Sequence, residues 1–129
     1  MVGVVVVSHN PKLSEEVIRF CQDMKKEDFK LINGGGIDKE GCFGTSPIVI
    51  EKAVMEADDG DGVVVLCDLG SSVLNARKAK EHIEGKVRVE IVDAPLVEGA
   101  IVAVSANHPK VKIEELIEFI KEAKAFPKL

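Results

Sequence analysis

Two short polar segments follow valine-rich runs and contain residue types suited to group transfer. Ser8 and His9 end a valine run, and Asp68 follows a second run, Gly62–Cys67. If the two runs are neighbouring parallel strands, His9 and Asp68 lie within side-chain reach at one edge of the sheet. The carboxylate then accepts one ring N–H, fixes the imidazole tautomer and leaves the other nitrogen free as a nucleophile or base. The alternative is that Asp68 only caps the following loop or helix.

Glycine-containing segments beside two predicted helix starts add backbone donors to this pair. Gly70 and Ser71 precede one helix, and Gly44 and Thr45 precede another. Glycine lets amides approach a ligand closely, and helix N-termini favour negative charge. The segments therefore predict an anion site, and a phosphoryl group is the anion that fits it best.

Other residues at predicted strand ends belong to the same rim, the edge of the sheet at which the carboxyl ends of its strands lie. Asn33 with its following glycines ends the second strand, and Asp93 ends the fourth. The remaining histidines, His82 near a helix end and His108 in a loop, are expected to be structural or solvent-facing. Three scattered histidines, and three cysteines without CxxC spacing, predict no metal site.

Composition narrows the possible partners. The chain has 129 residues, a net charge of −5, and neither Trp nor Tyr. An acidic protein repels phosphates, and without Trp or Tyr it has few aromatic side chains on which bases could stack, so it is a poor nucleic-acid binder. No segment is long and apolar enough for a membrane span, so we expect a cytoplasmic protein that folds as a single domain over residues 1–129.

Short apolar runs alternate with helix-period segments along the chain. The strand candidates are Val2–Val7, Phe29–Ile32, Gly62–Cys67 and Val87–Val92. The helix candidates lie around residues 13–24, from Ser46-Pro47 onward, over 72–82 and around 113–120. This order predicts an α/β three-layer sandwich, with a mostly parallel central sheet of about four strands flanked by helices.

Apolar spacing assigns the inward faces of these helices. It places Leu13, Ile48 and Leu74 among the residues that pack on the sheet. The segment from Ala94 to Pro109 is apolar on nearly all sides. It therefore predicts either a central core helix or a subunit interface, and the sequence favours neither.

Four motifs in order carry a family resemblance: VSH after the first strand, GGID followed by FGTS, CDLGSS, and APLVEG. Together they resemble the mannose-type enzyme IIA domain of the phosphotransferase system. Within that family they are most similar to the phosphotransfer subunits of dihydroxyacetone kinases that use phosphoenolpyruvate. The resemblance runs from residue 1 to about residue 107.

The resemblance implies a phosphohistidine carrier with no cofactor. His9 would accept a phosphoryl group from the histidine-containing phosphocarrier protein and pass it to ADP on a dihydroxyacetone kinase subunit. Asp68 matches the supporting aspartate, and Thr45, Gly70 and Ser71 match the phosphoryl pocket. The family is dimeric, which would explain the apolar segment after Ala94. The donor would be a separate protein.

Two residues depart from the family pattern, and two other functions stay open. Asn10 stands where a serine is common, and Cys42 is unusual in its loop. The chain could instead be a mannose-type sugar component that donates to a IIB partner. It could also be a non-enzymatic sensor that only binds small anions at the same rim.

Overall fold

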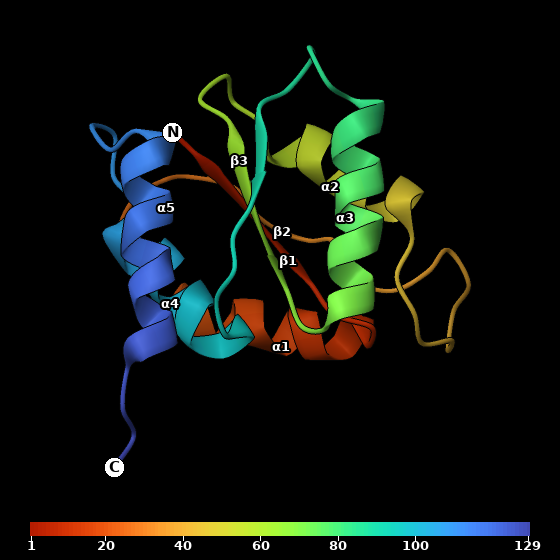
Figure 1. Ribbon diagram of the computed structural model, residues 1–129, viewed down its shortest axis with the longest axis horizontal. Coiled ribbons are helices and arrows are strands. Elements are labelled where there is room, and N and C mark those ends of the chain that lie inside the picture. Colours follow the sequence, from red (N-terminus) through yellow and green to blue (C-terminus); the bar gives the residue numbers. More distant parts are fainter.

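The computed structural model describes residues 1–129 and contains one parallel sheet (Figure 1). Its strands are β1 (Gly3–Val7), β2 (Leu31–Asn33), β3 (Val63–Cys67) and β4 (Val89–Ile91). Their order across the sheet is β2-β1-β3-β4, and every neighbouring pair is parallel. The predicted α/β architecture is confirmed.

Helices cover both faces of this sheet. They are α1 (Pro11–Gln22), α2 (Pro47–Ala57), α3 (Gly70–His82), α4 (Leu96–Ala106) and α5 (Ile113–Lys121), followed by the short 3-10 helix η1 (Glu122–Ala125). One core joins the sheet to α2 and α3, and the other joins it to α1, α4 and α5. Figure 1 shows α2 and α3 on the side opposite to α4 and α5. None of these helices has the length and apolar composition that a bilayer crossing requires.

The valine runs contain no polar residues because helices cover both faces of their strands. Val4 and Val64 point into the core beneath α1, α4 and α5, whereas Val5 and Val65 point into the core beneath α2 and α3. Every residue of β1 and β3 is buried. Parallel strands between two helical layers need no polar alternation.

The predicted buried faces of two helices were wrong at single residues, and the position at which each helix begins explains why. Because α2 begins at Pro47, with Ser46 capping the amide of Val49, its buried stripe starts at Ile50 and leaves Ile48 exposed. Leu74 is likewise exposed, because α3 begins at Gly70 and buries Ser72, Ala76 and Ala79.

Two smaller differences lie in α1 and β2. Leu13 is exposed, and α1 turns Ser14, Val17 and Cys21 inward instead. Strand β2 starts at Leu31, after the buried Phe29.

The apolar helix α4 packs against several elements of the same chain. The helix contacts α5 and α1 as well as β1 and β3. Its residues Gly99, Ala100, Ala103 and Val104 are buried. The core-helix interpretation is therefore confirmed for the inner side of α4, whereas Val97 is exposed, and the subunit interface stays a prediction.

Candidate functional site

The ends of β1 and β3 bring the two polar segments together. The strands are adjacent and in register, with Val7 opposite Cys67, and the amide of Asp68 donates to the carbonyl of Val7 (3.1 Å). The next residues of each strand therefore emerge side by side at the carboxyl edge of the sheet. His9 and Asp68 meet there, as the sequence predicted.

The imidazole of His9 is held from both ring nitrogens. Nδ1 lies 3.0 Å from Oδ1 of Asp68, and Nε2 lies 2.6 Å from Oγ of Ser71. An ionised carboxylate can only accept, so Nδ1 carries the proton and Nε2 presents its lone pair. In this state the hydroxyl of Ser71 donates to Nε2. The ring is about one-quarter exposed and is thus reachable from solvent.

Asp68 is fixed by more donors than the histidine alone. Its carboxylate accepts hydrogen bonds from the hydroxyls of Ser8 (3.0 Å) and Ser72 (2.8 Å). It also accepts from the backbone amides of His9 (3.0 Å) and Leu69 (2.8 Å). Burial by itself would raise the pKa of Asp68, but the donors from His9, Ser72 and Leu69 outweigh it and lower that pKa to about 2. The carboxylate therefore stays ionised throughout the physiological range.

The backbone of His9 is also anchored. The amide of Gly44 donates to the carbonyl of His9 (2.7 Å), and Gly44 has a φ of +137°, which favours glycine. This amide was predicted to bind the phosphoryl group, but in the structure it is already engaged. Gly44 positions the histidine instead.

Of the other predicted anion-binding residues, Ser71 contacts the imidazole directly. Gly70 and Ser71 form the first turn of α3, where amides have no acceptor inside the helix. The hydroxyl of Thr45 accepts from the side chain of Asn75 (2.6 Å), which joins the loop before α2 to α3. The rim therefore has a serine hydroxyl and free helix-start amides beside Nε2.

Asn10 and Asp93 have local roles. Oδ1 of Asn10 accepts from the amide of Lys12 (3.0 Å) and caps α1, so the asparagine serves the helix start. Asp93 is highly exposed and pairs with Lys124 (2.7 Å) instead of joining the histidine.

The remaining titratable candidates lie apart from His9. His82 pairs with Glu51 (2.9 Å) on the surface, and Nδ1 of His108 accepts from the amide of Lys110 (3.2 Å). Burial raises the pKa of Cys67 to about 11, so its thiol is a poor nucleophile at neutral pH. No three His, Cys, Asp or Glu side chains converge in a way that could hold a metal ion.

Sequence reasoning missed a partly buried polar network next to the segment that carries His9. The hydroxyl of Ser14 donates to Oδ1 of Asn33 (2.6 Å), which also accepts from the amide of Gly35 (2.9 Å). The amide of Gly36 in turn donates to the carbonyl of Ser8 (3.0 Å). These bonds tie the end of β2 to the segment that carries His9. Ser14 lies within a helix pattern and carries no sequence signal of burial.

The hydrogen bonds to Asp68 predict a pH-dependent stability. The pKa of this carboxyl is lowered from an ordinary 3.8 to about 2 in the folded chain. Its stabilising contribution is thus complete above the unfolded value and is lost as pH falls from about 5 to about 2. We expect Asp68→Asn to remove about 1–2 kcal/mol of this pH-dependent stability, measured by urea unfolding at a series of pH values. The exposed Asp38→Asn serves as the control. A variant at residue 68 with the wild-type slope would contradict the prediction.

Comparisons with known proteins place this chain in a family. A family model described as the fructose IIA component of the phosphotransferase system matches residues 3–121. The chain is 31% identical over 105 residues to a phosphoryl donor subunit of a PEP-dependent dihydroxyacetone kinase from Listeria innocua, covering 80% of this chain and 83% of the relative.

A second relative is much longer. The chain is 30% identical over 127 residues to the phosphoryl donor subunit of the Providencia stuartii kinase, covering 95% of this chain. It spans only 27% of that protein's length.

The fold agrees with a solved structure. A crystal structure of a protein of unknown function superposes with a TM-score of 0.81 at 23% identity and covers 95% of both chains. At that identity the likeness shows the fold alone. With the family model matching nearly the whole chain, the resemblance seen in the sequence is confirmed: this chain belongs to the mannose-type IIA family of the phosphotransferase system.

Proposed function

We propose that this chain is the phosphoryl-carrying component of a dihydroxyacetone kinase that uses phosphoenolpyruvate. In this proposal His9 accepts a phosphoryl group from the histidine-containing phosphocarrier protein and passes it to ADP bound on a kinase subunit. The observation that carries the proposal is the imidazole of His9, oriented by Asp68 through Nδ1 so that Nε2 faces the rim. The relatives named as phosphoryl donor subunits support the choice of pathway.

Acceptance of the phosphoryl group is a substitution at phosphorus. The lone pair on Nε2 of His9 forms the new N–P bond while the bond from phosphorus to the donor's histidine nitrogen breaks. The proton on Nδ1 stays in place, hydrogen-bonded to Asp68. The ring becomes cationic during transfer, and the adjacent carboxylate, ionised because its pKa is about 2, compensates that charge.

The transferred group would meet donors at the start of α3. The hydroxyl of Ser71 must leave Nε2 when the N–P bond forms, and it is then placed to donate to a phosphoryl oxygen. The first-turn amides of Gly70 and Ser71 add the field of a helix N-terminus. Thr45, held by Asn75, lies on the α2 side of the rim. Gly44 contributes indirectly by holding the carbonyl of His9.

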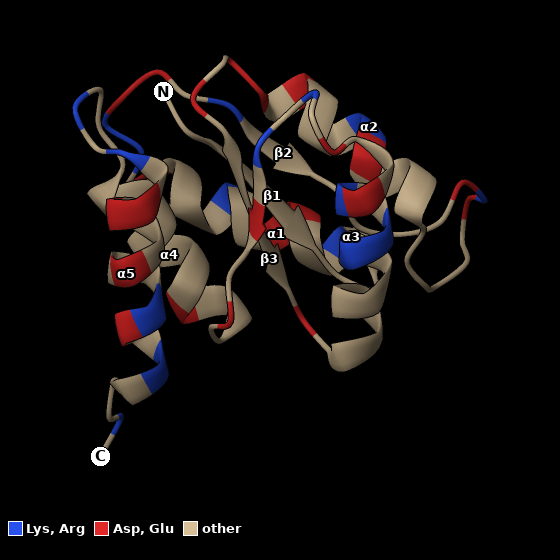
Figure 2. Cartoon of the chain, turned by 45° about the horizontal axis from the view of Figure 1, so that its top comes forward, with Lys and Arg blue, Asp and Glu red and all other residues tan.

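Exposed apolar side chains around this rim favour transfer between proteins. They lie in loops or in the first two turns of helices at the carboxyl edge of the sheet: Leu13, Phe43, Ile48, Leu69, Leu74 and Val97. In Figure 2 the first turn of α3 is free of charged residues, with the acidic end of β3 beside it. A small free substrate would not need these exposed apolar side chains, whereas a protein that docks at the rim would bury them.

A second candidate is a sugar-transport IIA component that donates to a IIB partner. The description of the matching family model, a fructose IIA component, favours it. Both candidates share the chemistry at His9 and differ only in the acceptor. The anion-sensor alternative requires no covalent step, so phosphorylation of His9 distinguishes it from both.

We expect His9→Ala to abolish phosphoryl acceptance. The chain is incubated with enzyme I, the phosphocarrier protein and labelled phosphoenolpyruvate, and incorporation is measured as acid-labile, base-stable label. His82→Ala and His108→Ala are matched controls, because both histidines lie away from the rim, and they should label normally. Label retained in the His9 variant would refute the mechanism. A wild-type chain that takes no label would favour the sensor.

The acceptor decides between the two transfer functions. We expect the phosphorylated chain to lose its label to ADP in the presence of dihydroxyacetone kinase subunits, and dihydroxyacetone phosphate to form when dihydroxyacetone is added. A mannose-type IIB component, offered in parallel, should take up label far more slowly. Preferred transfer to IIB would overturn the kinase assignment and leave the phosphohistidine chemistry intact.

A further inference from the structure

One face of α3 carries two polar side chains that reach the segments around the rim. Oγ of Ser71 lies 2.6 Å from Nε2 of His9. The side chain of Asn75 reaches Thr45 in the loop before α2. Residues four apart on a helix lie on the same face, with about 5–6 Å between their Cβ atoms. Asn75 therefore lies one turn behind Ser71 on the face that meets the imidazole.

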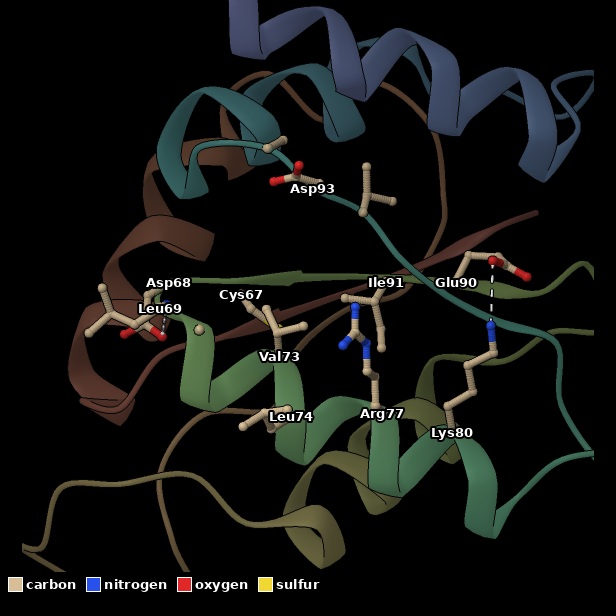
Figure 3. A pocket seen from close by; sticks show the side chains of 13 residues that line it. Cys67, Asp68, Leu69, Val73, Leu74, Arg77, Lys80, Glu90, Ile91 and Asp93 are labelled. Carbon is tan, nitrogen blue, oxygen red and sulfur yellow. Dashed lines mark hydrogen bonds and ion pairs between the residues drawn. The ribbon is translucent and has the colours of Figure 1, made fainter.

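The opposite face of α3 is turned toward strand β4. Figure 3 shows Arg77 and Lys80 rising from the helix toward that strand, where Lys80 pairs with Glu90 (3.6 Å). A hollow of about 650 Å³ lies between the helix and the strand, and Asn75 is not among the residues that line it. The polar partners of Asn75 thus belong to the rim and not to this hollow.

The side-chain amide of Asn75 has a fixed polarity. Its Nδ2 lies 2.6 Å from Oγ1 of Thr45 and 3.3 Å from the backbone carbonyl of the same residue. A carbonyl oxygen can only accept, so the group that faces it is the NH₂ and not the side-chain oxygen. Since this NH₂ also donates to Oγ1, the hydroxyl of Thr45 cannot donate back to Asn75. Its proton is left for another acceptor, and no other group in the structure accepts it.

The loop that carries Thr45 is anchored to the segment that carries His9. The amide of Gly44 donates to the carbonyl of His9 (2.7 Å), and Thr45 forms a parallel bridge with Gly36. The amide of Gly36 in turn donates to the carbonyl of Ser8 (3.0 Å). The free hydroxyl proton of Thr45 is therefore held beside the strand end from which the imidazole emerges.

We propose that Asn75 is a positioning residue that makes the hydroxyl of Thr45 a donor for the phosphoryl group on His9. The inference rests on the proposed function at His9 and assigns Asn75 a role within it. During transfer, negative charge lies on the three outer oxygens of phosphorus. A hydroxyl whose proton is already free can donate to one of them without reorganisation. Ser71 supplies one hydroxyl donor from the start of α3, and Thr45 supplies a second.

A double-variant cycle tests whether Asn75 acts through Thr45. The rate of His9 phosphorylation is measured over a range of phosphocarrier concentrations. We expect Thr45→Val and Asn75→Leu each to lower kcat about tenfold with KM unchanged, and N75L/T45V to be no slower than Thr45→Val alone. Thr45→Ser keeps the hydroxyl and should be several-fold faster than Thr45→Val. Lys78→Leu, at an exposed position of the same helix, is the control and should keep the wild-type kcat.

Asn75→Asp tests the polarity itself. Aspartate has nearly the same shape, but its carboxylate only accepts, so it captures the proton of Thr45. We expect Asn75→Asp to be slower than Asn75→Leu. The factor between them should be larger in the wild-type background than in the Thr45→Val background, which measures the added charge alone. Circular dichroism verifies the fold of each variant.

Three results of these measurements would overturn the inference. They are a wild-type rate in Asn75→Leu, losses that add up in N75L/T45V, and an equal factor between Asn75→Asp and Asn75→Leu in both backgrounds. The first would show that Asn75 has no influence on transfer. The second would show that it acts independently of Thr45, and the third that only its charge matters.

A small donor separates this inference from the proposed function. Phosphoramidate phosphorylates imidazole without a protein partner: Nε2 of His9 forms the N–P bond while the bond from phosphorus to the leaving ammonia breaks. The variants should show the same order of rates with this donor. If that order holds while the phosphocarrier protein does not label the wild type, the proposed donor is wrong and the role of Asn75 stands. A wild type that neither donor labels would overturn both.

Discussion

A single hydrogen bond, from Nδ1–H of His9 to the carboxylate of Asp68, is the constraint around which this site is organised. It fixes the tautomer, and so decides which nitrogen is free to react. The carboxylate is itself held by the hydroxyls of Ser8 and Ser72, both of them buried, and by backbone amides. Because the donors from His9, Ser72 and Leu69 lower the pKa of Asp68 to about 2, the carboxylate stays ionised and takes no proton from the imidazole at neutral pH. Orientation and charge compensation thus come from the same side chain.

The sheet makes this contact possible between residues far apart in sequence. Parallel pairing of β1 with β3 sets residues 7 and 67 opposite one another, so the next residues of both strands emerge at one edge. The pairing continues beyond the two strands, where the amide of Asp68 donates to the carbonyl of Val7. The φ of Gly44 and its bond to His9 then fix the backbone. The same edge gathers exposed apolar side chains, which suits the protein partner that the proposed transfer to His9 requires.

Much of this arrangement could be read from the sequence, because its signals are local. Uninterrupted valine runs predicted parallel strands, Ser46-Pro47 predicted a helix start, and the strand-end rule brought His9 and Asp68 together. Helix faces were less predictable: with α3 starting at Gly70, Leu74 points outward. Buried hydroxyls such as Ser14 look like surface residues in sequence, since only tertiary partners satisfy them. The hydrogen bond from the amide of Gly44 to the carbonyl of His9 could not be predicted for the same reason.

The most direct measurement is of the nitrogen that carries phosphorus. In a ¹⁵N-labelled, phosphorylated chain, the ¹⁵N–³¹P coupling identifies the bonded ring atom, and the ¹⁵N shifts identify the protonated one. The account predicts phosphorus on Nε2 of His9 with the proton retained on Nδ1, facing Asp68. Phosphorus on Nδ1, or on any other side chain, would contradict it.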